Sequence, residues 1–146
     1  MGSVLWIHPN ERMVPARMMV FGGLYSVRGY KEHEIVADGG TLVSLQYEYD
    51  LVKHHESELE PELVSVEKPF VRRVAPLVFY DHGRAETRQA TAGENSIDEL
   101  DSVGVGTAVE LGDNFEAGVY YGWPLRSTED TKRGHGRWSF NFILRW

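Results

Sequence analysis

The sequence of 146 residues contains no cysteine. This absence excludes a disulfide framework, and it excludes any metal site built on cysteine thiolates. It also fits an oxidising compartment, where stray thiols are a hazard.

Long apolar runs are absent as well. No stretch approaches the 18 apolar residues of a membrane-spanning helix, so such a helix is excluded. The opening "MGSVLWIHPNER" lacks the basic start and apolar centre of a secretory signal, and none is predicted. A membrane β-strand remains open, because it needs only about 10 residues and presents alternate ones to lipid.

Positive charge is scarce. Fifteen Lys and Arg stand against 22 Asp and Glu, which gives a net charge of −7. Nucleic-acid binding needs a basic face, so the balance argues against a nucleic-acid partner. Apolar residues make up 42% and charged residues 25%, which predicts one folded domain rather than a disordered tail.

Helical periodicity is hard to find, whereas alternation of apolar and polar residues is frequent. In the last segment, one face carries only apolar side chains, namely Trp138, Phe140, Phe142, Leu144 and Trp146. The pattern predicts five strands, at residues 40–52, 71–83, 100–111, 115–125 and 136–146. Pro76 lacks an amide donor, so it weakens the second strand or marks a bulge.

Two architectures share this period. The turn at 112–114 is short, the connections 84–99 and 126–135 are long and polar, and aromatic residues gather toward strand ends. Such asymmetry is typical of an outer-membrane β-barrel. A soluble β-sandwich with one buried and one wet face has the same alternation, and the pattern alone favours neither.

Two motifs resemble the signatures of the Omp85 superfamily of outer-membrane barrels. The segment "GGLYSVRGY" contains Val27, Arg28, Gly29 and Tyr30, similar to the family's loop that reaches into the barrel lumen. The segment "FYDHG" contains Phe79, Asp81 and Gly83, similar to the family's inner-wall motif. The resemblance extends from Phe21 to Trp146 and is nearest to the transporters of two-partner secretion. The family's C-terminal strand signal maps onto Trp138, Phe140, Phe142 and Trp146, where phenylalanine is commoner at the last position.

The resemblance implies an all-β fold: an antiparallel transmembrane barrel segment with a lumen loop at 21–39 and about five final strands. Residues 1–20 would be the remnant of an upstream strand or loop. The family's barrels have about sixteen strands after periplasmic POTRA domains, so a C-terminal fragment and an incomplete barrel are expected. The family's orientation puts 53–70, 112–114 and the C-terminus in the periplasm, and 84–99 and 126–135 outside.

The resemblance also implies that Arg28 meets Asp81. The residues agree independently, because Asp81 lies on the polar register of its strand with Phe79 and Gly83. Gly83 would let a loop approach closely, and Gly29 would permit the turn that presents Arg28. Arginine can donate two parallel hydrogen bonds to a carboxylate, so the pair is expected to position the loop.

The function implied is translocation of an unfolded partner protein, of haemolysin or adhesin type, across the outer membrane of a Gram-negative-type bacterium. No bond chemistry is involved, so no catalytic residue, metal or cofactor is expected. The expected partners are outer-membrane lipid, the secreted client and the barrel-assembly machinery. An insertase of the same superfamily, which assembles other barrels, is the alternative that the shared motifs leave open.

Two alternatives belong to other classes. A metal site would draw on His54, His55 and Glu56, with His82 and His135 as further ligands. Adjacent histidines in a strand point to opposite faces, so the cluster is interpreted as a solvated acidic linker. A soluble β-sandwich binding module is the other alternative, and it requires the apolar faces to pack against one another.

Overall fold

The computed structural model describes residues 1–8, 11–53, 70–90 and 95–146. The elements are β1 (Gly2–Ile7), a 3-10 turn η1 (Pro15–Arg17), β2 (Met19–Phe21), β3 (Ile35–Ala37), β4 (Gly39–Glu48), β5 (Val71–Glu86), β6 (Ile97–Leu111), β7 (Phe115–Pro124) and β8 (Arg137–Leu144). None of the helical segments within these ranges has the length and apolar character needed to cross a membrane.

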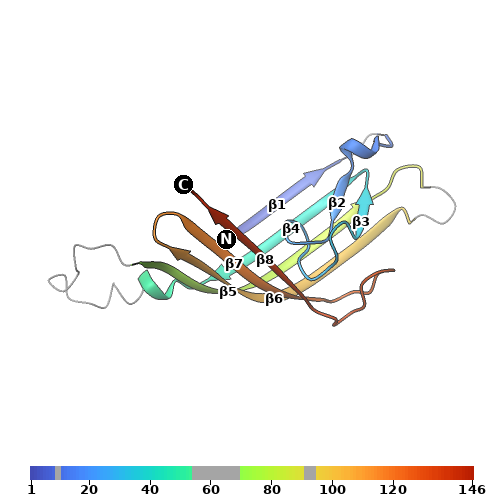
Figure 1. Cartoon of the computed structure of the whole chain (residues 1–146). Coiled ribbons are helices and arrows are strands. Elements are labelled where there is room, and N and C mark those ends of the chain that lie inside the picture. The colour runs from blue at the N-terminus through green and yellow to red at the C-terminus, as the bar shows by residue number, and fades with distance from the viewer. Residues whose placement is uncertain (9–10, 54–69, 91–94) are drawn as a thin grey trace.

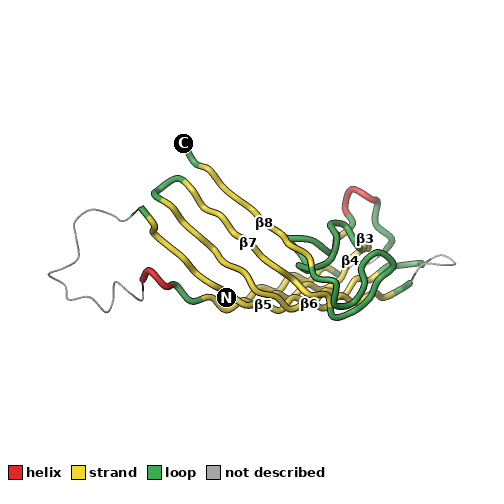
Figure 2. The backbone as a smooth tube through the Cα atoms, turned by 60° about the horizontal axis from the view of Figure 1, so that its bottom comes forward, coloured by secondary structure: helices red, strands yellow, loops and turns green. Residues whose placement is uncertain are grey.

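Six of the strands form one curved sheet in the order β1-β4-β5-β6-β7-β8 (Figure 1). Every pair of neighbours in this sheet is antiparallel. β2 and β3 form a separate two-stranded sheet. The predicted all-β class is therefore confirmed. The sheet is open, with β1 and β8 at its two edges, and Figure 2 shows β8 at one of these borders.

Each of the five predicted strands coincides with one strand of the large sheet, but the bounds differ. The prediction that 84–99 forms a connection is wrong in part, because β5 runs to Glu86 and β6 begins at Ile97. Arg84 lies directly opposite Glu99 in this extension, and their side chains approach to 3.6 Å. Charged residues thus continue the ladder as a cross-strand pair, although their polarity suggested a loop.

Two further differences concern the ends of the first predicted strand and the segment before it. Gly2–Ile7 forms a complete sixth strand, β1, which pairs with β4 along its whole length. All six residues of β1 are exposed, and its sequence, GSVLWI, lacks the alternation of polar and apolar residues from which the other strands of the sheet were predicted. β4 ends at Glu48, opposite Leu77, rather than at residue 52. The next residue of β5 is Pro76, which has no N–H to continue this ladder, although its carbonyl still accepts from Tyr49 N–H at 3.0 Å.

The two faces of the large sheet differ as the alternation predicts. We call "inner" the face that carries Ser44, Asp81, Ser102 and Gly122, and "outer" the opposite face. Over most of the sheet the outer side chains are apolar and exposed, and Phe140 is 71% exposed and Phe142 72%. At the end of the sheet where the inner segment lies, the outer face carries polar and charged side chains instead, namely His82, Arg84, Glu99 and Asp101. The described residues contain no second sheet against that face, and therefore no sandwich core.

The buried core lies on the inner face. Residues 19–38, called here the inner segment, run out and back through β2 and β3 and lie over β5 at one end of the sheet (Figure 1). Phe21, Val27 and Tyr30 of this segment pack with Ala85 and Leu100 of the sheet. The predicted loop at 21–39 therefore exists as a folded element, and its central turn rests on the sheet.

Candidate functional site

The guanidinium of Arg28 meets the carboxylate of Asp81 on the inner face. Its Nε and Nη2 donate to the two carboxylate oxygens, each at 2.8 Å, and the backbone N–H of Arg28 donates to Oδ2 at 3.1 Å. Asp81 is fully buried and Arg28 is 7% exposed. The two residues that the sequence paired are thus in direct bidentate contact, across 53 positions of chain.

Two residues of β4 complete this ion pair, and the sequence analysis missed both. Ser44 Oγ donates to Asp81 Oδ1 at 2.7 Å, and Gln46 Oε1 accepts from Arg28 Nη1 at 2.9 Å. Their positions on the polar face of β4 were visible, but the register that puts Ser44 opposite Asp81 was not. Each carboxylate oxygen of Asp81 thereby accepts two hydrogen bonds, which compensates the removal of the charge from water.

Two aromatic rings enclose the same guanidinium. The carbon centre of the guanidinium lies 3.6 Å from the ring centroid of Phe79 and 5.4 Å from that of Tyr120. Phe79 belongs to the predicted inner-wall motif, and Tyr120 on β7 was not singled out. A cation over an aromatic face is attracted by the ring quadrupole, most strongly where water is excluded. We call Arg28, Asp81, Ser44, Gln46 and Phe79 the latch.

Glycines bring the inner segment close enough for these contacts. Gly29 has φ +92°, a conformation that L side chains rarely adopt, so the turn after Arg28 depends on it. At Gly83, an added Cβ would lie 2.8 Å from Val27 Cγ2 and 2.9 Å from Phe21 Cδ1. The predicted roles of Gly29 and Gly83, as turn and as space, agree with this geometry.

Tyr30 is held where β7 leaves β6. Its phenol oxygen lies 3.0 Å from the carbonyl oxygen of Asp101 and 3.1 Å from that of Arg126, which share its single proton, and it accepts from Arg126 N–H at 3.2 Å. The regular pairing of β6 with β7 ends at Ser102 and Pro124, and one more backbone hydrogen bond follows, from Leu125 N–H to the carbonyl of Asp101 at 2.8 Å. The phenol lies directly beyond it. Burial raises the pKa of the Tyr30 phenol above its ordinary value, against an opposing effect of its backbone hydrogen bonds.

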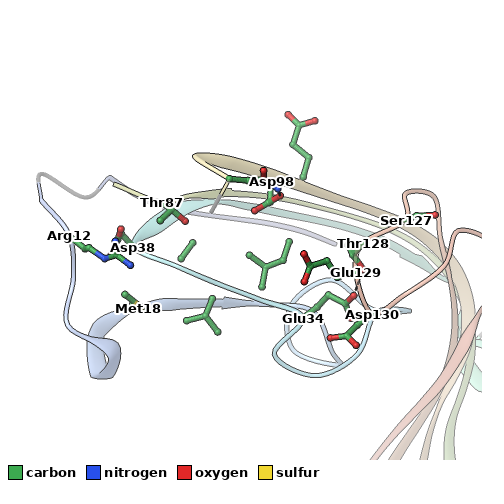
Figure 3. Close-up of a pocket in the computed structure, with 15 residues that line it drawn as sticks. Arg12, Met18, Glu34, Asp38, Thr87, Asp98, Ser127, Thr128, Glu129 and Asp130 are labelled. Carbon is green, nitrogen blue, oxygen red and sulfur yellow. Dashed lines mark hydrogen bonds between the residues drawn. The ribbon is translucent and has the colours of Figure 1, made fainter. Parts of the chain in front are cut away.

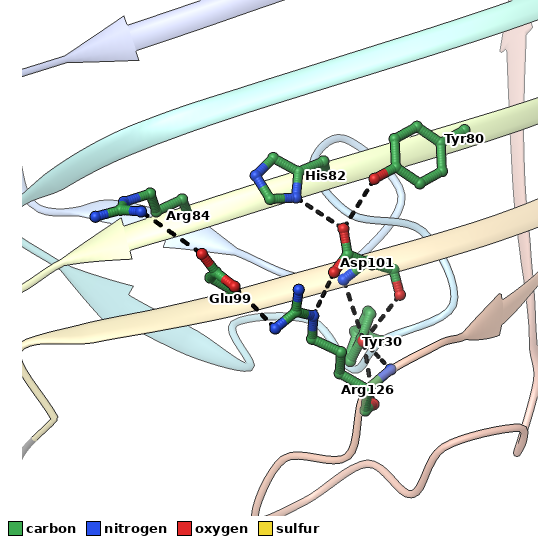
Figure 4. A network of polar contacts seen from close by, with 7 residues as sticks. All are labelled: Tyr30, Tyr80, His82, Arg84, Glu99, Asp101 and Arg126. Atoms are coloured by element: carbon green, nitrogen blue, oxygen red, sulfur yellow. Dashed lines mark hydrogen bonds and ion pairs between the residues drawn. The ribbon is translucent and has the colours of Figure 1, made fainter.

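A second polar network lies beside Tyr30, on the outer face of β5 and β6. Asp101 accepts hydrogen bonds from Tyr80 Oη at 2.9 Å and from Arg126 Nε, and contacts His82 Nδ1 at 2.7 Å (Figure 4). Glu99 also pairs with Arg126, at 2.8 Å. This network ties the segment after β7 to β5 and β6, near the anchoring point of Tyr30.

Glu34 ties the inner segment to the connection between β7 and β8. Its carboxylate accepts from the hydroxyls of Thr128 and Thr131, the latter at 2.7 Å, and from Lys31 N–H at 3.1 Å. Thr131 is buried, although it lies in a polar connection. No sequence pattern predicted this contact, because it joins two segments without regular alternation.

A pocket of about 570 Å³ lies between the inner segment and the rim of the sheet (Figure 3). Most of its charged side chains are acidic: Glu34, Asp38, Asp98, Glu99, Glu129 and Asp130, against Arg12. Asp38 is fully buried and accepts from the backbone N–H groups of Met13 and Arg88, each at 2.7 Å. Glu34 is engaged by the two threonines, so these two carboxylates serve to join segments of the chain.

From the latch, polar contacts continue along the inner face toward the turn at 112–114. Gln46 donates to Glu48 at 3.3 Å, and Glu48 pairs with Arg73. Arg73 donates in turn to Glu110 at 2.9 Å. A chain of side chains thus connects the inner segment with the opposite end of the sheet across β4, β5 and β6.

The residues assigned to the C-terminal strand signal lie away from the latch. Trp138, Phe140 and Phe142 project from the outer face of β8, each about two-thirds exposed or more, and Trp146 follows the strand and is fully exposed. Trp138 packs against Tyr121 of β7, with ring centroids 4.8 Å apart. Trp138, Phe140 and Phe142 of the strand signal therefore lie on the outer face of the sheet, and the inner-wall motif of Phe79, Asp81 and Gly83 lies on its inner face.

Of the five candidate metal ligands, the structure describes His82 and His135. His54, His55 and Glu56 lie outside the described residues. His82 contacts Asp101, and His135 lies in the connection between β7 and β8. Within the ranges that the structure describes, no group of three or more His, Asp or Glu side chains is arranged to hold a metal ion.

Comparisons with known proteins add no constraint. No family model, no curated protein and no solved structure matches the chain.

Proposed function

We propose that the chain forms part of the wall and the lumen latch of an outer-membrane barrel that exports an unfolded partner protein. The proposal rests foremost on one observation: Arg28 and Asp81 form a buried bidentate ion pair between a folded-in segment and the inner face of a β-sheet. A buried ion pair contributes little net stability, since desolvation opposes the attraction. It serves better to define one position of the segment.

The outer face supports a membrane location. Exposed aliphatic and aromatic side chains cover it, among them Leu45, Tyr47, Val78, Val105, Val119, Trp138, Phe140 and Phe142. An apolar face of this extent is costly in water and favourable against hydrocarbon. The inner face is polar or small along most of its length, with Ser44, Gln46, Asp81, Ser102 and Gly122, as a water-filled lumen requires.

The two open edges of the large sheet suggest that the wall contains more strands than these six. Within the described residues, β1 pairs only with β4, and β8 only with β7. In lipid, unpaired backbone groups at these edges would each cost several kcal/mol. We infer that further strands pair with both edges in the assembled protein and close the wall around the inner segment.

In this proposal, the inner segment occupies the lumen at rest and moves when the client passes. The client crosses as an extended chain, and no bond is made or broken. Movement requires Arg28 to leave Asp81, so the pair acts as the latch of the resting state. Water and the client then replace the contacts that the two charges lose.

Export from the native host tests the proposal. The gene is deleted, the surface and secreted proteins are compared, and the deletion is complemented with the parent chain, with Arg28→Ala, or with Lys31→Ala. The Lys31 control removes an exposed ion pair with Asp130 and leaves the latch intact. We expect one secreted protein to be lost and to return with the parent and the control, but not with Arg28→Ala.

Two results would contradict the proposal. Normal export with Arg28→Ala would remove the latch role, and a parent chain found in the soluble fraction would remove the membrane location. Loss of many outer-membrane barrels, rather than of one secreted protein, would identify the insertase instead.

A further inference from the structure

The tip of the inner segment rests on bare backbone near the end of β7, at Gly122. We propose that Gly122 is a positioning residue for the latch: a position without a side chain is required there for Arg28 to reach Asp81. This inference rests on the proposed function for its biological meaning. Its geometry, and the experiment below, concern only where the inner segment docks.

The contact between Gly122 and the loop tip is between two backbones. An added Cβ at Gly122 would lie 2.7 Å from Gly29 N, 2.8 Å from Gly29 Cα and 2.9 Å from Arg28 C. An added Cβ at Gly29 would lie 2.8 Å from the carbonyl carbon of Gly122 and 2.9 Å from its oxygen. Real Cβ atoms essentially never approach other heavy atoms this closely, and a backbone cannot rotate aside as a side chain can.

The strand itself does not need glycine at this position. Gly122 is not among the residues with positive φ, so its extended backbone suits any amino acid. Glycine within a strand is less favourable than alanine by about 0.5–1 kcal/mol. The requirement for glycine therefore comes from what lies above the strand, which is the turn Arg28–Gly29.

The residue directly opposite supports this reading. Gly104 of β6 pairs with Gly122, and an added Cβ at Gly104 would lie 2.2 Å from Cζ of Phe79. Phe79 is the ring on which the Arg28 guanidinium lies. The two glycines thus serve the same latch from adjacent strands, since one admits the ring below Arg28 and the other admits the backbone beside it.

Gly122→Ala tests the position of the Arg28 backbone without changing any charged group. The substitution leaves every hydrogen-bonding group of Arg28, Asp81, Ser44 and Gln46 in the protein, yet it displaces the backbone that carries Arg28. Gly2→Ala is the control for a glycine-to-alanine change in the same sheet. Gly2 lies in β1 and has no positive φ, and its added Cβ would meet only Leu45 Cδ2 at 3.2 Å and Ser44 O at 3.8 Å.

Amide hydrogen exchange of the full chain, in the buffer or detergent that keeps it folded, provides the test. We expect residues 22–34 to exchange at least about tenfold faster in Gly122→Ala than in the parent, which corresponds to about 1.4 kcal/mol. The strands β4 to β7 should stay protected, and Gly2→Ala should match the parent in residues 22–34. Unchanged protection of the inner segment in Gly122→Ala, or equal loss in both variants, would overturn the proposal.

A second background covers the case in which Gly122→Ala does not fold. Residues 26–31 are replaced by a glycine-serine linker of equal length, and Gly122→Ala is introduced into that chain. We expect no cost of the substitution there, because a linker without the side chains of Val27, Arg28 and Tyr30 has no contacts that hold its backbone against Gly122. If the substitution still prevents folding, the conflict lies within the sheet and the proposal is wrong.

These readouts report loop position and not export. Faster exchange in Gly122→Ala together with normal export would leave the docking inference standing and contradict the latch function. Unchanged exchange together with lost export would contradict the docking inference and leave the latch function standing.

Discussion

The hydroxyl of Ser44 lies between the two charges of the latch: it donates to Asp81 Oδ1 at 2.7 Å and accepts from Arg28 Nη2 at 3.3 Å. Because Asp81 is fully buried, water cannot solvate its carboxylate, and each protein donor supplies a hydrogen bond that water would otherwise provide. A residue of β4 thus takes part in the ion pair that joins the inner segment to β5.

Replacing Ser44 with alanine should weaken the latch without abolishing it. The loss of one hydrogen bond to a charged group costs about 1.5–3 kcal/mol. Ser44→Thr retains the hydroxyl and should lose much less. Denaturant unfolding of the three proteins measures the difference, and equal midpoints for alanine and threonine variants would show that the hydroxyl carries no weight.

Removing one partner of the buried ion pair should have a larger effect. Arg28→Ala leaves the Asp81 carboxylate buried without its main donor, and a loss of about 3–5 kcal/mol is typical of such changes. We expect Arg28→Lys to recover little, because an ammonium cannot reproduce the bidentate geometry. Exchanging the two charges, Arg28→Asp with Asp81→Arg, should restore part of the loss, and a double variant no better than the worse single one would argue against direct pairing.

Tyr30→Phe should loosen the junction between the inner segment and the end of β7. The variant lacks the hydroxyl that accepts from Arg126 N–H and donates to the neighbouring carbonyls. Losing these hydrogen bonds lowers the free energy of unfolding by about 1–3 kcal/mol where the backbone groups stay buried. The effect should depend on pH. The raised pKa of Tyr30 means that the folded protein holds the phenolic proton more tightly than the unfolded chain.

The contribution of the phenol is therefore complete below the ordinary tyrosine pKa of about 10 and is lost as the pH rises through the raised value. Unfolding free energies of the parent and Tyr30→Phe should differ by a constant amount at neutral pH and converge under alkaline conditions. A difference that stays constant throughout the alkaline range would show that Tyr30 acts through its ring alone.

Charge on the outer face tests the membrane location. Phe140 is exposed on that face, whereas Ser139 is its neighbour on the inner face. In a barrel wall, Phe140→Lys should cost about 2–4 kcal/mol if it lies near the middle of the bilayer, and Ser139→Lys much less. The amount of protein recovered in the outer membrane measures both, and equal recovery would contradict a lipid-facing β8.

The sequence predicted the fold well where two simple signals applied. Alternation located five strands and assigned their faces correctly, from Ser44 and Gln46 on one side of β4 to Phe140 and Phe142 on one side of β8. The pairing of Arg28 with Asp81 came from motifs and from register parity. For residues 1–20 the sequence indicated only the remnant of an upstream strand or loop, without bounds, because the segment that forms β1, GSVLWI, does not alternate between polar and apolar residues.

Most of the surroundings of the latch could not be predicted. Ser44, Tyr120 and Gly122 reach Arg28 or Gly29 only through the lateral register of strands, and a one-residue shift would have turned each of them to the other face. Contacts between irregular segments, such as Glu34 with Thr131, leave no pattern in either partner.

The strand order has an arithmetic consequence for any complete assembly. Since six strands alternate in direction, β1 and β8 run opposite ways at the two borders of the sheet. If further strands close this sheet into a ring in which every neighbour is antiparallel, the ring contains an even number of strands, so the added strands are even in number as well. An assembly whose mass or symmetry shows that an odd number of strands is added would need one pair of neighbouring strands to be parallel.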